Sequence, residues 1–145
     1  MLDTTRAQGE TLLTDPQLSN GPLVVVGGRL HMLTGTGSRA GLNENAQVWL
    51  CDIENSSFTL VRDEQYNMYS SVGSDCRLGG GAQWVEKDGA LLHLTTREGC
   101  SELNSLTADG ADVPLLCPQG SMDCIAACSG QARVLFVGML DMRLQ

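Results

Sequence analysis

Short apolar runs separated by glycine-bearing turns recur along the chain. Three of these runs share one pattern and occupy residues 29–34, 91–96 and 134–139. The turns that precede them are Gly27-Gly28, Lys87-Asp88-Gly89 and Ser129-Gly130, each following a shorter apolar segment. A β unit of this size cannot bury both of its faces alone, so it stacks on copies of itself, commonly as blades around a propeller axis. The pattern therefore predicts an all-β repeat.

A second pattern, in which a strand turns and returns, follows each of the first two runs. Its segments are 48–53, 54–56 and 58–61 in one copy, and 103–106, 108–110 and 113–116 in the other. They align without a gap, so each copy predicts a unit of four antiparallel strands.

These repeats predict a β-propeller segment with about two complete four-stranded antiparallel blades and a half-blade at each end. The complete blades span 22–62 and 82–117, the end of one blade spans 1–16, and the start of a further blade spans 122–145. We interpret residues 1–145 as one partial β-propeller domain.

When the three runs are aligned by amino-acid type, His31, His93 and Phe136 occupy the same position. A position that takes both imidazole and phenyl rings is typical of packing in a strand, and a general base is the alternative. Cys124 and Cys128 lack a second cysteine pair with ligand spacing. We therefore predict no metal and no cofactor.

Composition limits the classes of partner. The formal net charge is -8, Lys87 is the single lysine, and no basic cluster is present, which predicts no binding to nucleic acid or acidic membranes. No run approaches the roughly 20 apolar residues that span a bilayer, and Met1 is followed by polar and acidic residues. We expect a cytoplasmic chain whose six cysteines are reduced thiols, with disulfides in an exported chain as the alternative.

Asp75 and Arg77 are the candidate substrate-binding residues. They lie in the long connection between the two complete blades, flanked by Gly73 and the glycines at 79–81. Charged side chains on a glycine-bent loop often face a channel or a partner. A mutual ion pair or a turn cap is the alternative.

Three segments carry a family resemblance: Ser74-Asp75-Cys76-Arg77-Leu78-Gly79-Gly80-Gly81, residues 92–96 with Glu102-Leu103, and residues 121–124 with 134–138 and 141–145. They resemble the β-propeller repeats of prolyl oligopeptidase-type serine peptidases, in the dipeptidyl-peptidase or acylaminoacyl-peptidase branch. The resemblance implies a propeller that limits the access of peptide substrates to a partner α/β-hydrolase domain. It also makes the adjacent pair Asp63-Glu64 a candidate for holding a substrate amino group, with a solvated turn as the alternative.

The catalytic serine of such peptidases lies in a Gly-x-Ser-x-Gly elbow on the hydrolase domain. This chain has no such elbow, since Gly37-Ser38-Arg39-Ala40-Gly41 has the wrong spacing. We therefore expect a non-catalytic portion of a serine peptidase that is inactive alone.

Two other classes stay open: a stand-alone module that binds protein or peptide, and an enzyme built on cysteine and histidine, with Cys76 or Cys100 as the thiol. Open blade edges also predict self-association by strand addition, which would bury apolar residues such as Leu12, Leu13, Val134 and Phe136.

Overall fold

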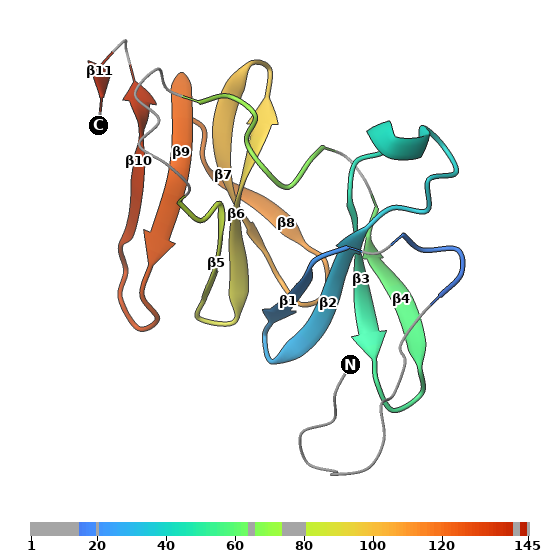
Figure 1. The fold of residues 1–145 in the computed structure, drawn as a ribbon. Coiled ribbons are helices and arrows are strands. Elements are labelled where there is room, and N and C mark those ends of the chain that lie inside the picture. Colours follow the sequence, from blue (N-terminus) through green and yellow to red (C-terminus); the bar gives the residue numbers. More distant parts are fainter. Residues whose placement is uncertain (1–14, 20, 64–65, 74–80, 141–142, 145) are drawn as a thin grey trace.

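The computed structural model of the chain describes residues 15–19, 21–63, 66–73, 81–140 and 143–144. Within these residues the strands form three antiparallel sheets that follow one another in chain order (Figure 1). The first sheet contains β1 (Leu23–Val26), β2 (Arg29–Thr34), β3 (Gln47–Asp52) and β4 (Ser57–Arg62), and the short 3₁₀ helix η1 (Gly41–Asn43) lies between β2 and β3. The second sheet contains β5 (Trp84–Lys87), β6 (Ala90–Arg97), β7 (Cys100–Leu106) and β8 (Asp112–Leu116). The third sheet contains β9 (Gly120–Ala127), β10 (Val134–Leu140) and β11 (Arg143–Leu144), with β10 in the middle.

The predicted all-β class and the four-stranded antiparallel sheets are confirmed. None of the described sheets closes on itself, so a propeller ring stays a prediction. The predicted end of a preceding blade, at 1–16, falls mainly on residues outside those that the structure describes.

Two-residue turns fix how the strands of the first two sheets pair. The turn between β1 and β2 has φ of 57° at Gly27 and 73° at Gly28, and the turn between β5 and β6 has 51° at Asp88 and 85° at Gly89. Positive φ at both central positions is the geometry of type I′ hairpins, whose twist matches that of the flanking strands. The two turns are therefore equivalent, and they set a common register for both sheets.

This register corrects the sequence-based alignment of the histidines. Leu23 pairs with Met32 in the first sheet, and Trp84 pairs with His93 in the second, each at the same distance from its turn. His93 is thus equivalent to Met32, and His31 is equivalent to Leu92. A shift of one residue moves a side chain to the other face of a sheet, so the two histidines lie on opposite faces of equivalent strands.

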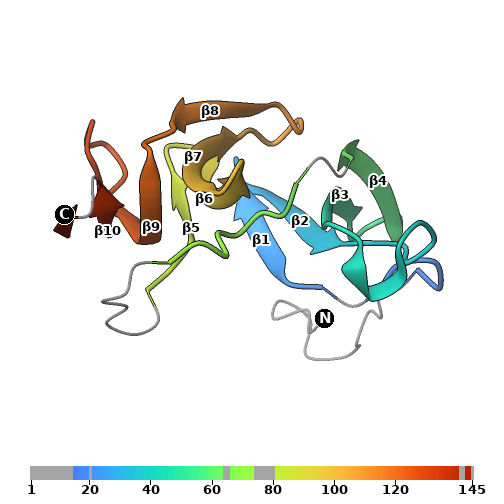
Figure 2. The same cartoon turned by 90° about the horizontal axis from the view of Figure 1, so that it is seen from above.

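The sheets stack face to face, with the second between the first and the third (Figure 2). Leu33 and Val48 of the first sheet are buried in one core together with Leu91 and Leu106 of the second. The equivalents of Leu33 and Val48 in the second sheet, which are Leu94 and Leu103, pack into another core. That core contains Met122 and Ile125 of the third sheet, with Val134 and Phe136 partly buried against it. The first and second sheets therefore present equivalent faces to the sheet that follows each of them.

Equivalent threonines of the first two sheets donate hydrogen bonds to the segments that precede these sheets. Thr34 donates a hydrogen bond to the carbonyl oxygen of Ser19, and Thr95, its equivalent, donates to that of Asn67. Met68, in the connection between the first two sheets, is 1% exposed, and its carbonyl oxygen accepts a hydrogen bond from the indole of Trp84. The connection therefore packs along one end of the first core and leaves its neighbours Asn67 and Tyr69 beside the first sheet.

Candidate functional site: the loop between β2 and β3

The first two sheets differ most in the loop between their second and third strands. In the second sheet Glu98-Gly99 makes this connection, whereas in the first sheet residues 35–46 make it. Repeats need only the short turn to pair their strands, and long loops on a rigid scaffold commonly carry binding functions. The inserted loop is therefore the candidate functional site.

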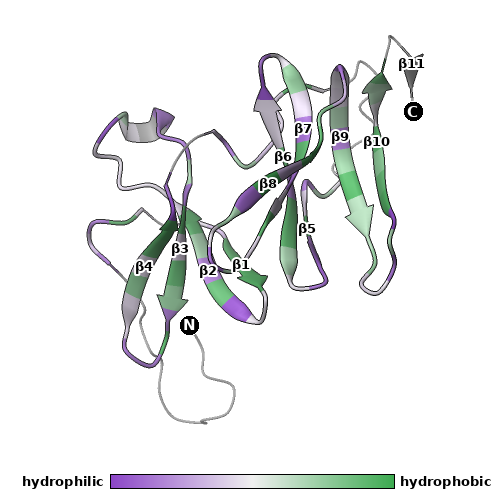
Figure 3. Cartoon of the chain, turned by 180° about the vertical axis from the view of Figure 1, so that it is seen from behind, coloured by the Kyte–Doolittle hydropathy of each residue, from purple (hydrophilic) through white to green (hydrophobic). Residues whose placement is uncertain are grey.

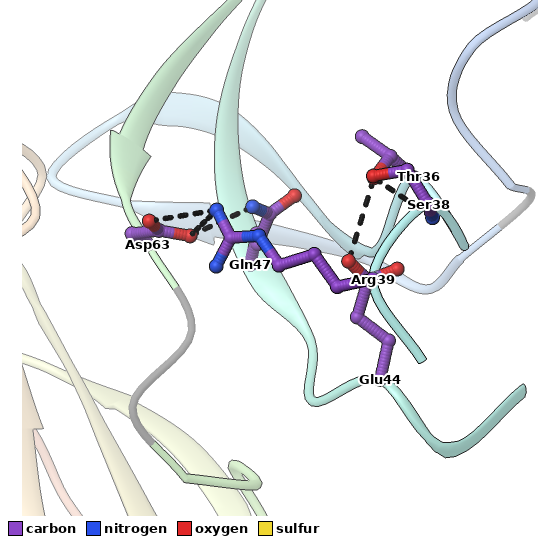
Figure 4. Close-up of polar contacts among 6 residues, drawn as sticks. All are labelled: Thr36, Ser38, Arg39, Glu44, Gln47 and Asp63. Carbon is purple, nitrogen blue, oxygen red and sulfur yellow. Dashed lines mark hydrogen bonds and ion pairs between the residues drawn. The ribbon is translucent and has the colours of Figure 1, made fainter. Parts of the chain in front are cut away.

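Hydrogen bonds within the loop orient the carboxylate of Glu44 (Figure 4). The backbone N–H of Gly37 donates to Glu44, and the hydroxyl of Thr36 lies 3.4 Å from its Oε1 atom. The hydroxyls of Thr36 and Ser38 are 2.7 Å apart. Gly37 has φ of 69°, a left-handed conformation that glycine adopts without a steric penalty and that turns its N–H toward the carboxylate.

A second group ties the loop to the end of β4. Arg39 Nη2 lies 3.2 and 3.0 Å from the two carboxylate oxygens of Asp63, and Gln47 Nε2 donates to Asp63 Oδ1 at 2.8 Å (Figure 4). The ion pair is half-exposed, so it contributes about 0–1 kcal/mol to stability and mainly positions the loop. Asp63 of the predicted acidic pair is thus engaged by its own chain, and Glu64 lies outside the described residues.

A hollow of about 500 Å³ lies beside this loop. Its lining comes from three parts of the chain: the segment before β1, the loop with the end of β2, and the connection after β4. The residues that line it include Glu44, Asn67, the half-exposed Tyr69 and several glycines. Its volume falls within the range of small-molecule sites, and the mixture of hydroxyl, amide and backbone groups suits a peptide-like ligand.

A buried polar network joins the first two sheets. Arg62 Nε lies 2.9 Å from Asp112 Oδ2, and His93 Nε2 lies 3.0 Å from Asp112 Oδ1. The side chains of Arg62 and Asp112 are 3% and 7% exposed, and that of His93 is fully buried. Burial by itself raises the pKa of Asp112, but the hydrogen bond from His93 and the positive charge of Arg62 outweigh it, and the net pKa is lowered.

Tyr66 covers the guanidinium of Arg62, with its ring centroid 5.1 Å from Cζ. Burial and the negative charge of Asp112 raise the pKa of the Tyr66 phenol. The tyrosine therefore stays neutral at physiological pH and acts as an apolar, aromatic lid on a buried ion pair.

Both histidines are engaged in packing between the sheets. His31 is fully buried, and its two ring nitrogens lie 3.0 Å from the carbonyl oxygens of Arg29 and Ala108. His93 faces Asp112 on one side and the carbonyl oxygen of Leu94 on the other. Among the described residues, neither imidazole has a hydroxyl or thiol as a hydrogen-bond partner. Neither histidine is therefore positioned there as the general base that activates a nucleophile.

The remaining sequence-based candidates are only partly described. Asp75, Arg77 and Cys76 lie outside the described residues, so the predicted substrate-binding pair stays a prediction. Cys51, Cys100, Cys117, Cys124 and Cys128 are free thiols. Burial, a hydrogen bond to Glu102 and the nearby Cys100 raise the pKa of Cys117, which keeps this thiol protonated at neutral pH rather than activated. No group of three or more metal-ligating side chains occurs within the described part of the chain.

Comparison with known proteins gives no independent assignment. No protein-family model matches the chain, and no curated protein matches it in sequence. Over the described ranges, the chain has no helix of the length and hydrophobicity needed to cross a bilayer.

Proposed function

We propose that the chain is a non-catalytic β-propeller portion of a prolyl oligopeptidase-type serine peptidase, limiting the access of peptides to a partner α/β-hydrolase domain. One observation supports it most: equivalent faces of the first and second sheets each pack on the next sheet. Blades that surround a propeller axis stack in this head-to-tail manner, whereas the two sheets of a simple sandwich face each other. The peptidase assignment rests on the sequence resemblance.

The chemistry of the described side chains agrees with a steric role. The two imidazoles contact carbonyl oxygens and a buried carboxylate. Ser38, in the segment whose sequence most resembles a nucleophile elbow, lies on an exposed loop and contacts the hydroxyl of Thr36. Such a segment contributes sterically, because it narrows the path to the hydrolase so that short peptides pass and folded proteins do not.

A chimera tests this function. The two corresponding blades of a prolyl oligopeptidase-type peptidase are replaced by residues 22–117, and the rates of cleavage of short and long peptides are compared with those of its isolated hydrolase domain. The proposal predicts that the chimera discriminates against long peptides and that the isolated domain does not. A chimera that unfolds cooperatively yet cleaves both lengths equally contradicts a role in access.

Labelling of the isolated chain tests its non-catalytic nature separately. A serine-directed fluorophosphonate should leave every residue, including Ser38, unmodified, and chromogenic dipeptidyl substrates should be hydrolysed no faster than in buffer. Covalent labelling or turnover above that background would assign the chain a nucleophile of its own.

The hollow beside the inserted loop favours a second candidate, a stand-alone module that binds peptide or protein. Titration with a mixture of short peptides, followed by NMR chemical shifts, distinguishes this candidate. Saturable shifts confined to residues 35–46 and to Asn67 and Tyr69 support the module, and shifts scattered without saturation contradict it.

A further inference from the structure

The outer face of the first sheet carries an apolar row that crosses all four strands. Leu23 pairs with Met32, Met32 with Trp49, and Trp49 with Leu60, so these side chains lie side by side on one face. Leu23 and Leu60, at the two ends of the row, are 51% and 41% exposed. The opposite face of this sheet is already buried against the second sheet.

The outer face of the third sheet is apolar as well. Side chains alternate along β10, so that Val134 and Phe136 pack toward the second sheet while Leu135 and Val137 point away from it. Leu135 is 69% exposed and pairs with the exposed Ala126 of β9. Hydropathy colouring shows these hydrophobic stretches along the strands of both end sheets (Figure 3). Val134 and Phe136 are only partly buried, so self-association by strand addition at the sheet edges stays a prediction.

The equivalence between the repeated sheets indicates which kind of surface each outer face would contact. The positions of the apolar row correspond to Trp84, His93, Asn104 and Pro114 of the second sheet, through the shared register and the equivalent bulges in β3 and β7. His93 and Trp84 lie on the face of the second sheet that packs against the first. The outer face of the first sheet is therefore the equivalent of a face that receives a preceding sheet. The outer face of the third sheet is the side from which the stack would continue.

We propose that a second copy of the chain docks its third sheet on the outer face of the first sheet, continuing the stack head to tail. The same chain already makes this kind of contact twice, between apolar sheet faces of equivalent orientation. The named positions on both outer faces are uncharged, so burial of apolar area drives the contact. The net charge of -8 on each copy opposes it, and salt weakens that repulsion. A contact between two different faces is heterologous and produces a closed ring or an open filament.

Complementation between two variants tests the proposal. Leu135→Asp disables the outer face of the third sheet, and Leu60→Asp disables that of the first. Leu115→Asp, on β8 of the middle sheet and 54% exposed, is the matched control. Sedimentation velocity over a wide concentration range should show self-association of the wild type that strengthens with salt. Each of the two variants should associate at least about tenfold more weakly, which corresponds to about 1.4 kcal/mol, and the control should associate as the wild type does.

A mixture of the two variants distinguishes the head-to-tail arrangement from all others. Each variant retains one intact face, so the mixture should form one-to-one dimers and nothing larger. A wild type that stays monomeric throughout, a mixture that does not dimerise, or a control that loses association equally overturns the proposal. If Leu60→Asp loses its native circular dichroism spectrum, Leu23→Asp replaces it on the same face.

Discussion

Substitution of Asp112 by asparagine should destabilise the chain strongly, because it leaves the buried guanidinium of Arg62 without a counter-charge. Asparagine keeps the shape of the side chain and an oxygen that accepts a hydrogen bond from His93. The variant therefore removes the charge and little else. Arg62 is 3% exposed, so water cannot solvate it in place of the carboxylate.

The magnitude follows from the burial of the pair. Breaking a buried ion pair by removing one partner destabilises a protein by about 3–5 kcal/mol. That loss is a large part of the total of about 5–15 kcal/mol that stabilises an ordinary domain. At about 4 °C per kcal/mol for a chain of this size, the melting temperature should fall by roughly 12–20 °C. Replacing both partners, in Arg62→Met with Asp112→Asn, removes the buried cation too, and should recover most of the loss.

Urea unfolding followed by tryptophan fluorescence measures these differences. A loss below about 1 kcal/mol in the single variant would contradict the reasoning, as would a double variant less stable than the single one. The pH dependence provides an independent check. The pKa of Asp112 is lowered in the folded chain from its ordinary 3.8, so its contribution is complete above that value and is lost as pH falls further. The difference in unfolding free energy between wild type and Asp112→Asn should therefore shrink in strong acid.

Three other comparisons test the packing between sheets by the same unfolding assay. His93→Phe should destabilise by about 1.5–3 kcal/mol because it removes a hydrogen bond to a buried carboxylate, and a change under about 0.5 kcal/mol would identify His93 as a simple packing residue. Asn104→Leu should stabilise the chain by about 1 kcal/mol. Asn104 is fully buried, and neither polar atom of its amide has a described hydrogen-bond partner. A loss of stability in this variant would reveal a polar role for Asn104. Gly110→Ala should lower the free energy of unfolding by at least about 2 kcal/mol more than Gly99→Ala does. Both glycines have positive φ, but only a Cβ at Gly110 would clash with the backbone of Val61, and equal losses would contradict the close approach of the sheets.

The strands and sheets of the fold were accessible from the sequence because their signals are local. Alternation of apolar residues and two-residue glycine turns define hairpins within a few residues, and the four-stranded units appear where these signals predict them. The alignment of His31 with His93 was wrong because it matched letters rather than counting residues from the turns. In an antiparallel sheet the turn sets the register, and an error of one residue assigns a side chain to the wrong face.

The candidate site was only partly accessible, because its contacts are not local. Residues 35–46 could be recognised as a loop between two strands, but nothing in the sequence pairs Arg39 with Asp63. Arg62 at the end of a strand is typical of a solvated position, yet it is buried because Asp112, in the next sheet, faces it. Such pairs follow from how the sheets stack, which the strand pattern alone does not specify.

Nuclear Overhauser effects between methyl groups test the stacking order of the sheets most directly. This stacking order predicts cross-peaks between Leu33 and Leu91 across the first core, and between Leu94 and Ile125 across the second. It predicts none between Leu33 and Leu94, which occupy equivalent positions on faces that point to different neighbours. Cross-peaks between Leu33 and Leu94 would mean that equivalent faces meet in a sandwich, and would contradict the propeller-like stack.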